Sequence, residues 1–212
     1  MTAPADAPAD APAEKPLTRK QRAIFEAALD VFSEQGFART ATAEIAKRAG
    51  VAEGTIFRTW RTKRDLLSAL VTPVILKLVS PWLARELEGI AESDELAAFV
   101  RALYKSRIEG VVAKHPRAVR ILLQEIAFHP ELQQALKDEA GAEFVPPLLD
   151  AIGRFQQRGV IRPMPREAVL RLLVVNFAGL LVSEWFTLPG GDPDPDAELD
   201  RTVAFVCRGL QP

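Results

Sequence analysis

A short helix that ends at a glycine, followed four residues later by a second short helix, is the feature that most constrains the fold of this chain. It lies in the stretch RAGVAEGTIFRTWRTKRDLL, residues 48–67. Apolar spacing predicts one helix over Thr42–Ala49, ended by Gly50, and the next over Gly54–Trp60. Thr and Arg crowd the second helix more than a packed core requires. This helix is therefore predicted to face a partner outside the protein.

Almost every other ordered segment also has helical spacing, and we find no convincing strand alternation. In the first predicted helix, Ile24, Ala28, Val31 and Phe32 share one face, and Gly36 ends the helix. The sequence therefore predicts an all-α protein. Further helices are expected over Asp94–Ala113, Arg117–Phe128, Glu131–Arg158, Arg166–Phe186 and Ala197–Gly209.

A capping motif and several prolines set the expected helix ends. Thr62-Lys63-Arg64-Asp65 reads as a capping box that begins a fourth helix. Pro73 and Pro81 are expected to kink or break this fourth helix. Gly141 and the pair Pro146-Pro147 are expected to interrupt the long segment that contains them.

Charge is divided unevenly along the chain. From Lys15 to Leu70 there are eleven Lys/Arg and six Asp/Glu, a balance of +5. The whole chain has a net charge of −1, so the remaining residues contribute −6. A basic N-terminal third joined to an acidic remainder indicates a polyanionic partner for one end only.

Composition disfavours several kinds of chemistry. The chain has one cysteine, Cys207, and two histidines, His115 and His129. We therefore expect no internal disulfide, a cytoplasmic location, and no zinc or haem site. Ser–His and Cys–His arrangements and phosphate-cradling glycine loops are also missing from the sequence. Neither an enzyme nor a bound cofactor or metal is predicted.

The helices around residues 42–63 are predicted to form a helix-turn-helix, whose second helix enters the major groove of DNA. Arg58 is the expected base reader, because a guanidinium can pair with the two major-groove acceptors of guanine. Arg39, Lys63 and Arg64 are expected over the phosphate backbone. The inner face is assigned to Ile45, Ala46, Ala49, Val51, Ile56 and Trp60, and the outer face to Glu53, Thr55, Arg58, Thr59 and Thr62.

A solvated surface hairpin is the alternative for these helices. From Arg39 to Arg64 there are seven basic and two acidic residues, which favours the nucleic-acid interpretation. Residues 24–67 as a whole also resemble the DNA-binding domain of the TetR family of bacterial transcriptional regulators. The matching features are Ala27-Ala28, Phe32, Gly36, Thr40, Ile45-Ala46, Ala49-Gly50-Val51, Gly54-Thr55, Lys63 and Leu66-Leu67, and more loosely the segments KHPRAVRILLQE and VAFVCRGL.

The resemblance implies DNA contacts, and this chain departs from the family pattern at some of them. Phe57 stands where a tyrosine commonly holds a phosphate, and Glu53 stands where lysine or another polar residue is frequent. Ala41 and Ala52 replace residues that often cap the two helices, although Thr40 or Thr42 could cap the first. The implied contacts are Thr42, Ala43, Glu53, Gly54, Thr55, Phe57, Arg58, Thr59 and Lys63.

The chain is predicted to have three parts. Residues 1–16 repeat Ala-Pro-Ala-acid and are predicted to be a disordered tail. Residues 17–66 are predicted to be the helix-turn-helix DNA-binding domain. Residues 67–212 are predicted to form a helical domain for ligand binding and dimerisation.

The segment Leu172–Val182 is apolar nearly all round, yet it is too short for a membrane span and contains Asn176. Such a helix is covered on both sides in a soluble protein. One cover is the chain's own core, and we expect the other to be a second subunit rather than a larger monomeric core. The resemblance likewise implies a homodimer built on the last two helices, with contacts assigned to Leu173, Phe177, Leu180, Leu181, Val203 and Val206.

The resemblance further implies a mostly apolar pocket for a small organic effector. Tyr104 and Asn176 stand out, because a polar group among apolar neighbours needs a partner. Each aromatic residue could instead be ordinary core. The predicted wall residues are Trp82, Phe99, Tyr104, Phe128, Phe144, Phe155, Asn176 and Trp185.

Together these patterns predict a dimeric, ligand-responsive transcriptional repressor. It would be released from a palindromic operator in double-stranded DNA by a small apolar or amphipathic molecule. The alternative is a small-molecule-binding protein of the same fold that has lost sequence-specific DNA binding. Glu53 and Phe57 motivate that alternative.

Overall fold

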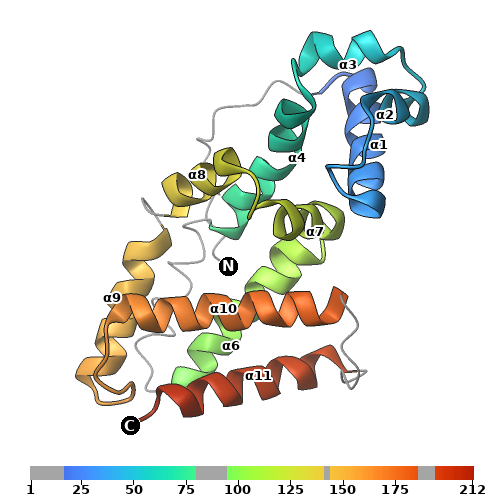
Figure 1. Ribbon diagram of the computed structural model, residues 1–212. Coiled ribbons are helices and arrows are strands. Elements are labelled where there is room, and N and C mark those ends of the chain that lie inside the picture. The colour runs from blue at the N-terminus through green and yellow to red at the C-terminus, as the bar shows by residue number, and fades with distance from the viewer. Residues whose placement is uncertain (1–16, 80–94, 141–143, 186–193) are drawn as a thin grey trace, which may run out of the picture. The chain divides into compact units, whose positions relative to one another are not determined.

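The computed structural model describes residues 17–79, 95–140, 144–185 and 194–212 (Figure 1). The predicted disordered tail lies outside the described residues. The chain divides into two compact units, Met1–Leu66 and Leu67–Pro212. Every regular element in the described ranges is a helix, which confirms the all-α prediction.

The first unit is a compact group of three helices: α1 (Arg19–Gln35), α2 (Thr42–Ala49) and α3 (Glu53–Thr59). Thr18 caps α1 through a capping box with Gln21. The α1 helix ends at Gly36, with φ 78°, and α2 ends at Gly50, with φ 66°. Both angles are positive, a backbone region that glycine enters without the steric cost of a Cβ.

The core of the first unit forms where the apolar stripes of the three helices meet. Ile45 and Ile56 are fully buried, and Trp60 packs its ring against that of Phe25 at 5.2 Å between centroids. Since these buried faces point inward, the opposite faces of α2 and α3 stay outside. The buried residues of the three helices are Ile24, Ala27, Ala28, Val31, Phe32, Ile45, Ala46 and Ile56.

Helix α4 (Lys63–Leu78) begins in the first unit and ends in the second. Its start is the predicted capping box: the Thr62 hydroxyl accepts from Asp65 N–H, and the Asp65 carboxylate accepts from Thr62 N–H, both at 3.0 Å. The sequence predicted a kink or a break at Pro73. Pro73 lies inside α4, so a break there was wrong, and a kink stays a prediction. Pro81 is outside the described residues.

The second unit contains the remaining helices. A π-helical turn, η1, follows α6 directly, where the sequence predicted one continuous helix. Pro146 and Pro147 lie in the first turn of α9 and begin that helix, because proline needs no N–H partner at such a position. Gly141 lies outside the described residues. The bounds are α6 (Leu96–Arg107), η1 (Ile108–Val112), α7 (Pro116–Glu125), α8 (Pro130–Glu139), α9 (Val145–Gln157), α10 (Arg166–Trp185) and α11 (Pro195–Leu210).

One apolar core joins α6, α9, α10 and α11. Helix α11 packs against both α6 and α10, and α10 also packs against α9 (Figure 1). Phe99 and Phe155 meet in this core, with ring centroids 5.4 Å apart. Burial of such large side chains is the main stabilising contribution to this unit.

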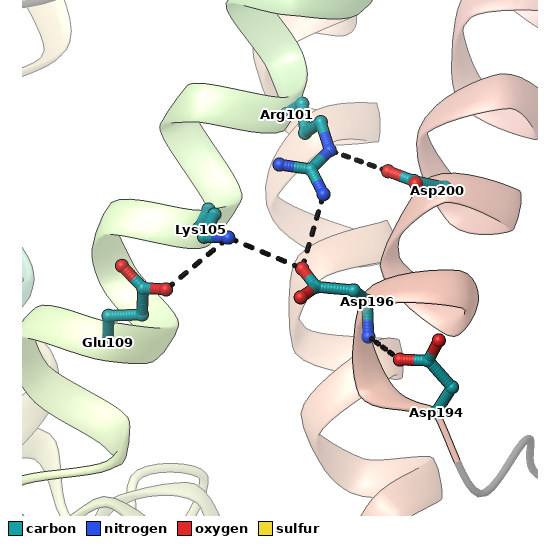
Figure 2. Close-up of polar contacts among 6 residues, drawn as sticks. All are labelled: Arg101, Lys105, Glu109, Asp194, Asp196 and Asp200. Atoms are coloured by element: carbon teal, nitrogen blue, oxygen red, sulfur yellow. Dashed lines mark hydrogen bonds and ion pairs between the residues drawn. The ribbon is translucent and has the colours of Figure 1, made fainter.

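A surface ion cluster fastens the start of α11 to α6 (Figure 2). Arg101 donates to Asp200 at 2.6 Å and to Asp196 at 3.2 Å. Lys105 also contacts Asp196, at 3.4 Å. Asp194 caps α11 by accepting from the N–H of Asp196. The hydrogen bond to Asp200 raises the pKa of Arg101 above its ordinary value. The cluster thus links the start of α11 to α6.

No helix in the described ranges is long and apolar enough to cross a membrane. Helix α10 comes nearest to such a segment in its composition. Its twenty residues are instead shared between the core and a face that points outward.

Candidate functional site

The outward face of α3 is composed of small, polar and basic side chains. Arg58 and Thr59 are exposed, and Thr55 is half-buried beside them. None of the described residues forms a hydrogen bond or ion pair with the Arg58 guanidinium. The buried Ile56 holds α3 against the first unit. The donors of Arg58 on the outward face are therefore available to an external partner.

Gly54 is exposed in the first turn of α3, and packing does not explain why it is a glycine. A Cβ placed there would meet nothing within 4 Å, and no positive φ is present at this position. Inside a helix, glycine lowers the folding stability by up to about 1 kcal/mol relative to alanine. The space around Gly54 is open, so the backbone of α3 is accessible to an external molecule at this position.

Thr42 and Glu53 lie together at the starts of α2 and α3. The Thr42 hydroxyl donates to the Glu53 carboxylate at 2.5 Å. Thr40 instead donates to the carbonyl of Gly36 at 2.8 Å, so neither threonine caps α2 as suggested from the sequence. The carboxylate of Glu53 is held against Thr42 at the edge of the outward face.

Phe57 and Ala43 add an apolar part to this face. The Phe57 side chain is 42% exposed, and Ala43 is exposed on α2. A phenyl ring has no hydroxyl for a phosphate, yet it can pack against sugar or base methyl groups. The predicted contact residues of α2 and α3 are thus exposed or half-buried, and the Thr42–Glu53 hydrogen bond joins the starts of the two helices.

Two predicted backbone contacts differ in their surroundings. Arg39 is exposed and donates to the carbonyl of Gln35 at 2.9 Å. Lys63 donates to the carbonyls of Phe37, at 2.7 Å, and Thr40, at 2.8 Å, and its ammonium lies 4.3 Å from the centre of the Phe37 ring. Lys63 therefore fixes the turn between α1 and α2, and its contact with the DNA backbone stays a prediction.

Replacing Lys63 by methionine is expected to destabilise the first unit by roughly 1–2 kcal/mol, because two carbonyls lose a charged donor. Chemical denaturation followed by circular dichroism measures this. Arg61→Met is the control, since Arg61 is exposed and is expected to change stability by less than about 0.5 kcal/mol. Equal stability of the two variants would contradict the role assigned to Lys63.

The second unit contains an apolar cavity of about 290 Å³. Of the predicted wall residues, Tyr104 and Phe144 line it. The Tyr104 hydroxyl donates to the carbonyl of Leu173 at 2.7 Å, which gives this buried polar group its partner. Burial also raises the pKa of Tyr104, so its hydroxyl stays protonated. The other walls of the cavity are formed by α6, α7, α8, α9, α10 and the end of α4.

Four predicted wall residues lie elsewhere. Phe99 and Phe155 are buried in the core, where their rings fill the space between helices. Phe128 is 79% exposed, and Asn176 donates to the carbonyl of Leu172 on its own helix. The spacing of aromatic residues along the sequence does not show which of them fill the core and which line the cavity. Trp82 and the side chain of Trp185 lie outside what the structure describes.

Arg107 is a charged cavity residue that the sequence analysis missed. It is 6% exposed, at the end of α6, and lines the cavity. Burial lowers the pKa of Arg107 to about 10. A signal was present: Arg107 follows Phe99, Leu103 and Tyr104 at helical spacing, so it occupies an apolar face.

The outward side of α10 carries an exposed apolar stripe. Leu172, Val175 and Val182 are all exposed and lie on one side of the helix, with Gly179 between them. A Cβ at Gly179 would meet nothing within 4 Å. On α11, Phe205 is 73% exposed. We call Leu172, Val175, Gly179, Val182 and Phe205 the α10–α11 stripe.

The residues assigned to a subunit contact from the sequence lie on the opposite side of these helices. Leu173, Leu181, Val203 and Val206 are buried in the chain's own core, and Phe177 and Leu180 are partly buried against it. Burial in the chain's own core makes these residues unavailable to a second subunit, whereas the α10–α11 stripe is exposed. Helix α10 is apolar around its circumference, so its sequence does not show which side faces inward.

Comparison with known proteins adds a sequence match in the first unit. Residues 24–70 match the family described as bacterial regulatory proteins, tetR family. The chain is 31% identical over 96 residues to the fatty acid metabolism regulator protein of Bacillus subtilis (strain 168), a match that covers 45% of this chain and 43% of that protein. It is 30% identical over 110 residues to the HTH-type transcriptional regulator RutR of Escherichia coli (strain K12), covering 52% and 49%. The chain thus matches about half of the length of these relatives.

Solved structures resemble the fold over most of the chain. The ketosteroid transcriptional regulator KstR2 of Mycobacterium tuberculosis aligns with a TM-score of 0.63 and 20% identity, covering 93% of this chain and 97% of that one. FadR from Bacillus subtilis, solved in complex with stearoyl-CoA, aligns with a TM-score of 0.63 and 19% identity, covering 90% and 99%. At such identities the likeness concerns the fold.

A helix-turn-helix unit whose sequence matches bacterial regulatory proteins, followed by a helical unit, is the arrangement of a DNA-binding transcriptional regulator. Residues 24–70 match the tetR family of bacterial regulatory proteins, and the fold resembles that of a solved transcriptional regulator, which confirms the resemblance found in the sequence.

Proposed function

We propose that this protein is a homodimeric transcriptional repressor that binds a palindromic operator in double-stranded DNA. The observation that carries the proposal is the outward face of α3, where Arg58 and Thr59 are exposed and Gly54 leaves its backbone open. A helix of this kind reads base edges in the major groove. The match of residues 24–70 to the tetR family supports the same use.

The α10–α11 stripe and the two-fold symmetry of a palindromic site support a dimer. Exposed valine, leucine and phenylalanine side chains on adjacent helices form a surface that a second copy can cover. Such a contact has two-fold symmetry, since the same residues face each other. Two reading helices about 34–36 Å apart would then match one turn of a palindromic site.

The cavity in the second unit is the proposed site for a small apolar or amphipathic effector. Its walls are almost wholly aliphatic and aromatic. The FadR structure of similar fold is described with stearoyl-CoA, a molecule with a long apolar chain. Binding would release DNA if the effector favours a conformation in which the two reading helices no longer match the groove.

The alternative function is effector binding without sequence-specific DNA recognition. Two observations favour it: the Glu53 carboxylate is held beside the interface, and Phe57 replaces a phosphate-binding hydroxyl. Repulsion between Glu53 and phosphates lowers affinity most at low salt. Tight effector binding by a folded dimer that enriches no DNA sequence would establish this alternative.

Replacing Gly54 by alanine separates folding from DNA binding. The open space at this position predicts stability that is unchanged or raised by up to about 1 kcal/mol. The added methyl group occupies space that the DNA backbone or bases would need, so affinity for duplex DNA should fall about tenfold or more. Thermal unfolding and fluorescence anisotropy with a random-sequence duplex at low salt measure the two effects.

Gly110→Ala is the matched control, because a Cβ there also meets nothing within 4 Å but the residue lies in η1 of the second unit. It should leave duplex affinity unchanged. If Gly54→Ala bound duplex DNA as tightly as the wild-type protein, α3 would not be in close contact with DNA.

A further inference from the structure

Arg107 places a largely unpartnered guanidinium at the wall of the apolar cavity. Its side chain is 6% exposed, and its Nε and Nη2 atoms have no hydrogen-bond partner among the residues that the structure describes. Only Nη1 has such a contact, a long one of 3.4 Å to the carbonyl of Lys77. Buried polar groups are rarely left without partners, so this one calls for an explanation.

The two free atoms form one edge of the guanidinium. The Nε–H and one N–H of Nη2 point in parallel, which is the geometry that pairs with both oxygens of a carboxylate at once. Phe144 lies beside the group, with its ring centre 4.9 Å from the central carbon. The ring and the Lys77 carbonyl occupy other sides of the group and leave this edge unused.

The cavity supplies no counter-charge from its described walls. Arg107 is the one ionisable side chain besides Tyr104 among the lining residues, and the Tyr104 hydroxyl is committed to Leu173. Although burial lowers the pKa of Arg107 to about 10, the group is still charged at neutral pH. Aspartate and glutamate are missing from the described walls, so these walls leave the charge of Arg107 open to a bound anion.

Water does not replace such a molecule well. An ordered water needs two to four polar partners, and these walls offer little beyond the donors of Arg107.

The backbone at Arg107 is a second feature of this position. Arg107 is the last residue of α6, directly before the wider π-helical turn of η1, and such turns often occur at functional sites.

We propose that the cavity binds a carboxylic acid with a compact apolar body, and that the Nε/Nη2 edge of Arg107 pairs with its carboxylate. This rests on the proposed effector function and gives that effector its chemical class. A water occupies about 30 Å³ in the liquid, so 290 Å³ accommodates roughly ten non-hydrogen atoms. Octanoate, with that number of atoms, is a suitable probe.

Isothermal titration calorimetry of the full chain with octanoate, methyl octanoate and octanol tests the proposal. These probes share an apolar chain, and the anionic carboxylate is present in octanoate alone. Octanoate should bind at least about tenfold more tightly than the ester or the alcohol, since a bidentate charge-assisted pair forms with the acid only.

Arg107→Met is the decisive variant, because methionine fills a similar apolar space and removes the charge. It should bind the three probes with similar affinity and unfold at a temperature no lower than the ligand-free wild type. Arg107→Lys keeps the charge but loses the paired donors, so it should retain only part of the preference. Arg154→Met is the control, since Arg154 also has an unpartnered buried Nε but does not line the cavity.

The outcomes separate the two proposals. Ester and alcohol binding as tightly as octanoate would overturn the assignment to a carboxylate and leave the effector cavity standing. An unchanged preference in Arg107→Met, or a preference lost equally in Arg154→Met, would also overturn it. If none of the three probes binds to folded protein, both the carboxylate assignment and the apolar effector cavity fail.

Discussion

Replacing Val175 by aspartate is expected to convert the protein from a dimer to a folded monomer. Val175 is 61% exposed in the middle of the α10–α11 stripe. In the proposed dimer it faces its own copy across the two-fold axis, so the substitution buries two like charges without partners. Size-exclusion chromatography with light scattering measures the mass.

The same substitution should weaken operator binding by about 100-fold or more, because the second half-site is no longer held at high effective concentration. Stability of the isolated chain should change little, since Val175 makes no core contact. Phe128→Asp is the control: it places the same charge at an exposed apolar position outside α10 and α11. A Val175→Asp protein that stays dimeric would show that the stripe is not the interface.

Replacing Arg58 by alanine is expected to cost about 1–3 kcal/mol of binding free energy at the operator, a loss of about five- to 150-fold. Arg58 is exposed on α3, and no described residue forms an ion pair or hydrogen bond with it. Its guanidinium is therefore available to the two major-groove acceptors of a guanine. The variant should also tolerate any base pair at that one position.

Arg61→Ala removes the same charge from a nearby exposed position outside α3. It should weaken all duplexes alike, through the loss of general attraction to phosphates, and leave the preferred sequence unchanged. Selection from a random duplex library, repeated with each variant, gives both readouts. Should Arg58→Ala select the wild-type sequence with wild-type affinity, the placement of the reading face on α3 would be incorrect.

Much of the first unit could be predicted from sequence, because local signals there agree. Gly36 and Gly50 end two amphipathic helices, and Thr62 with Asp65 begins a fourth. Lys63 was less predictable. Its position in the pattern suggests a surface charge, whereas its bonds to the α1–α2 turn depend on the tertiary fold.

The second unit was harder to predict, since its helices are apolar on more than one side. Leu173 and Val175 are neighbours of similar hydropathy, yet one is buried in the core and the other is exposed. Likewise, Phe99 fills the core while Phe144 lines the cavity. Only the packing of helices distant in sequence decides between these roles.

Selection of purified wild-type protein on a random duplex library tests the central claim most directly. If α3 reads the major groove within a two-fold dimer, the enriched sequences should converge on a palindrome. Its half-sites should have centres about one helical turn, 10–10.5 base pairs, or a multiple of it apart. No enrichment by protein shown to be folded and dimeric would contradict the account, and would leave the cavity as the functional site of the molecule.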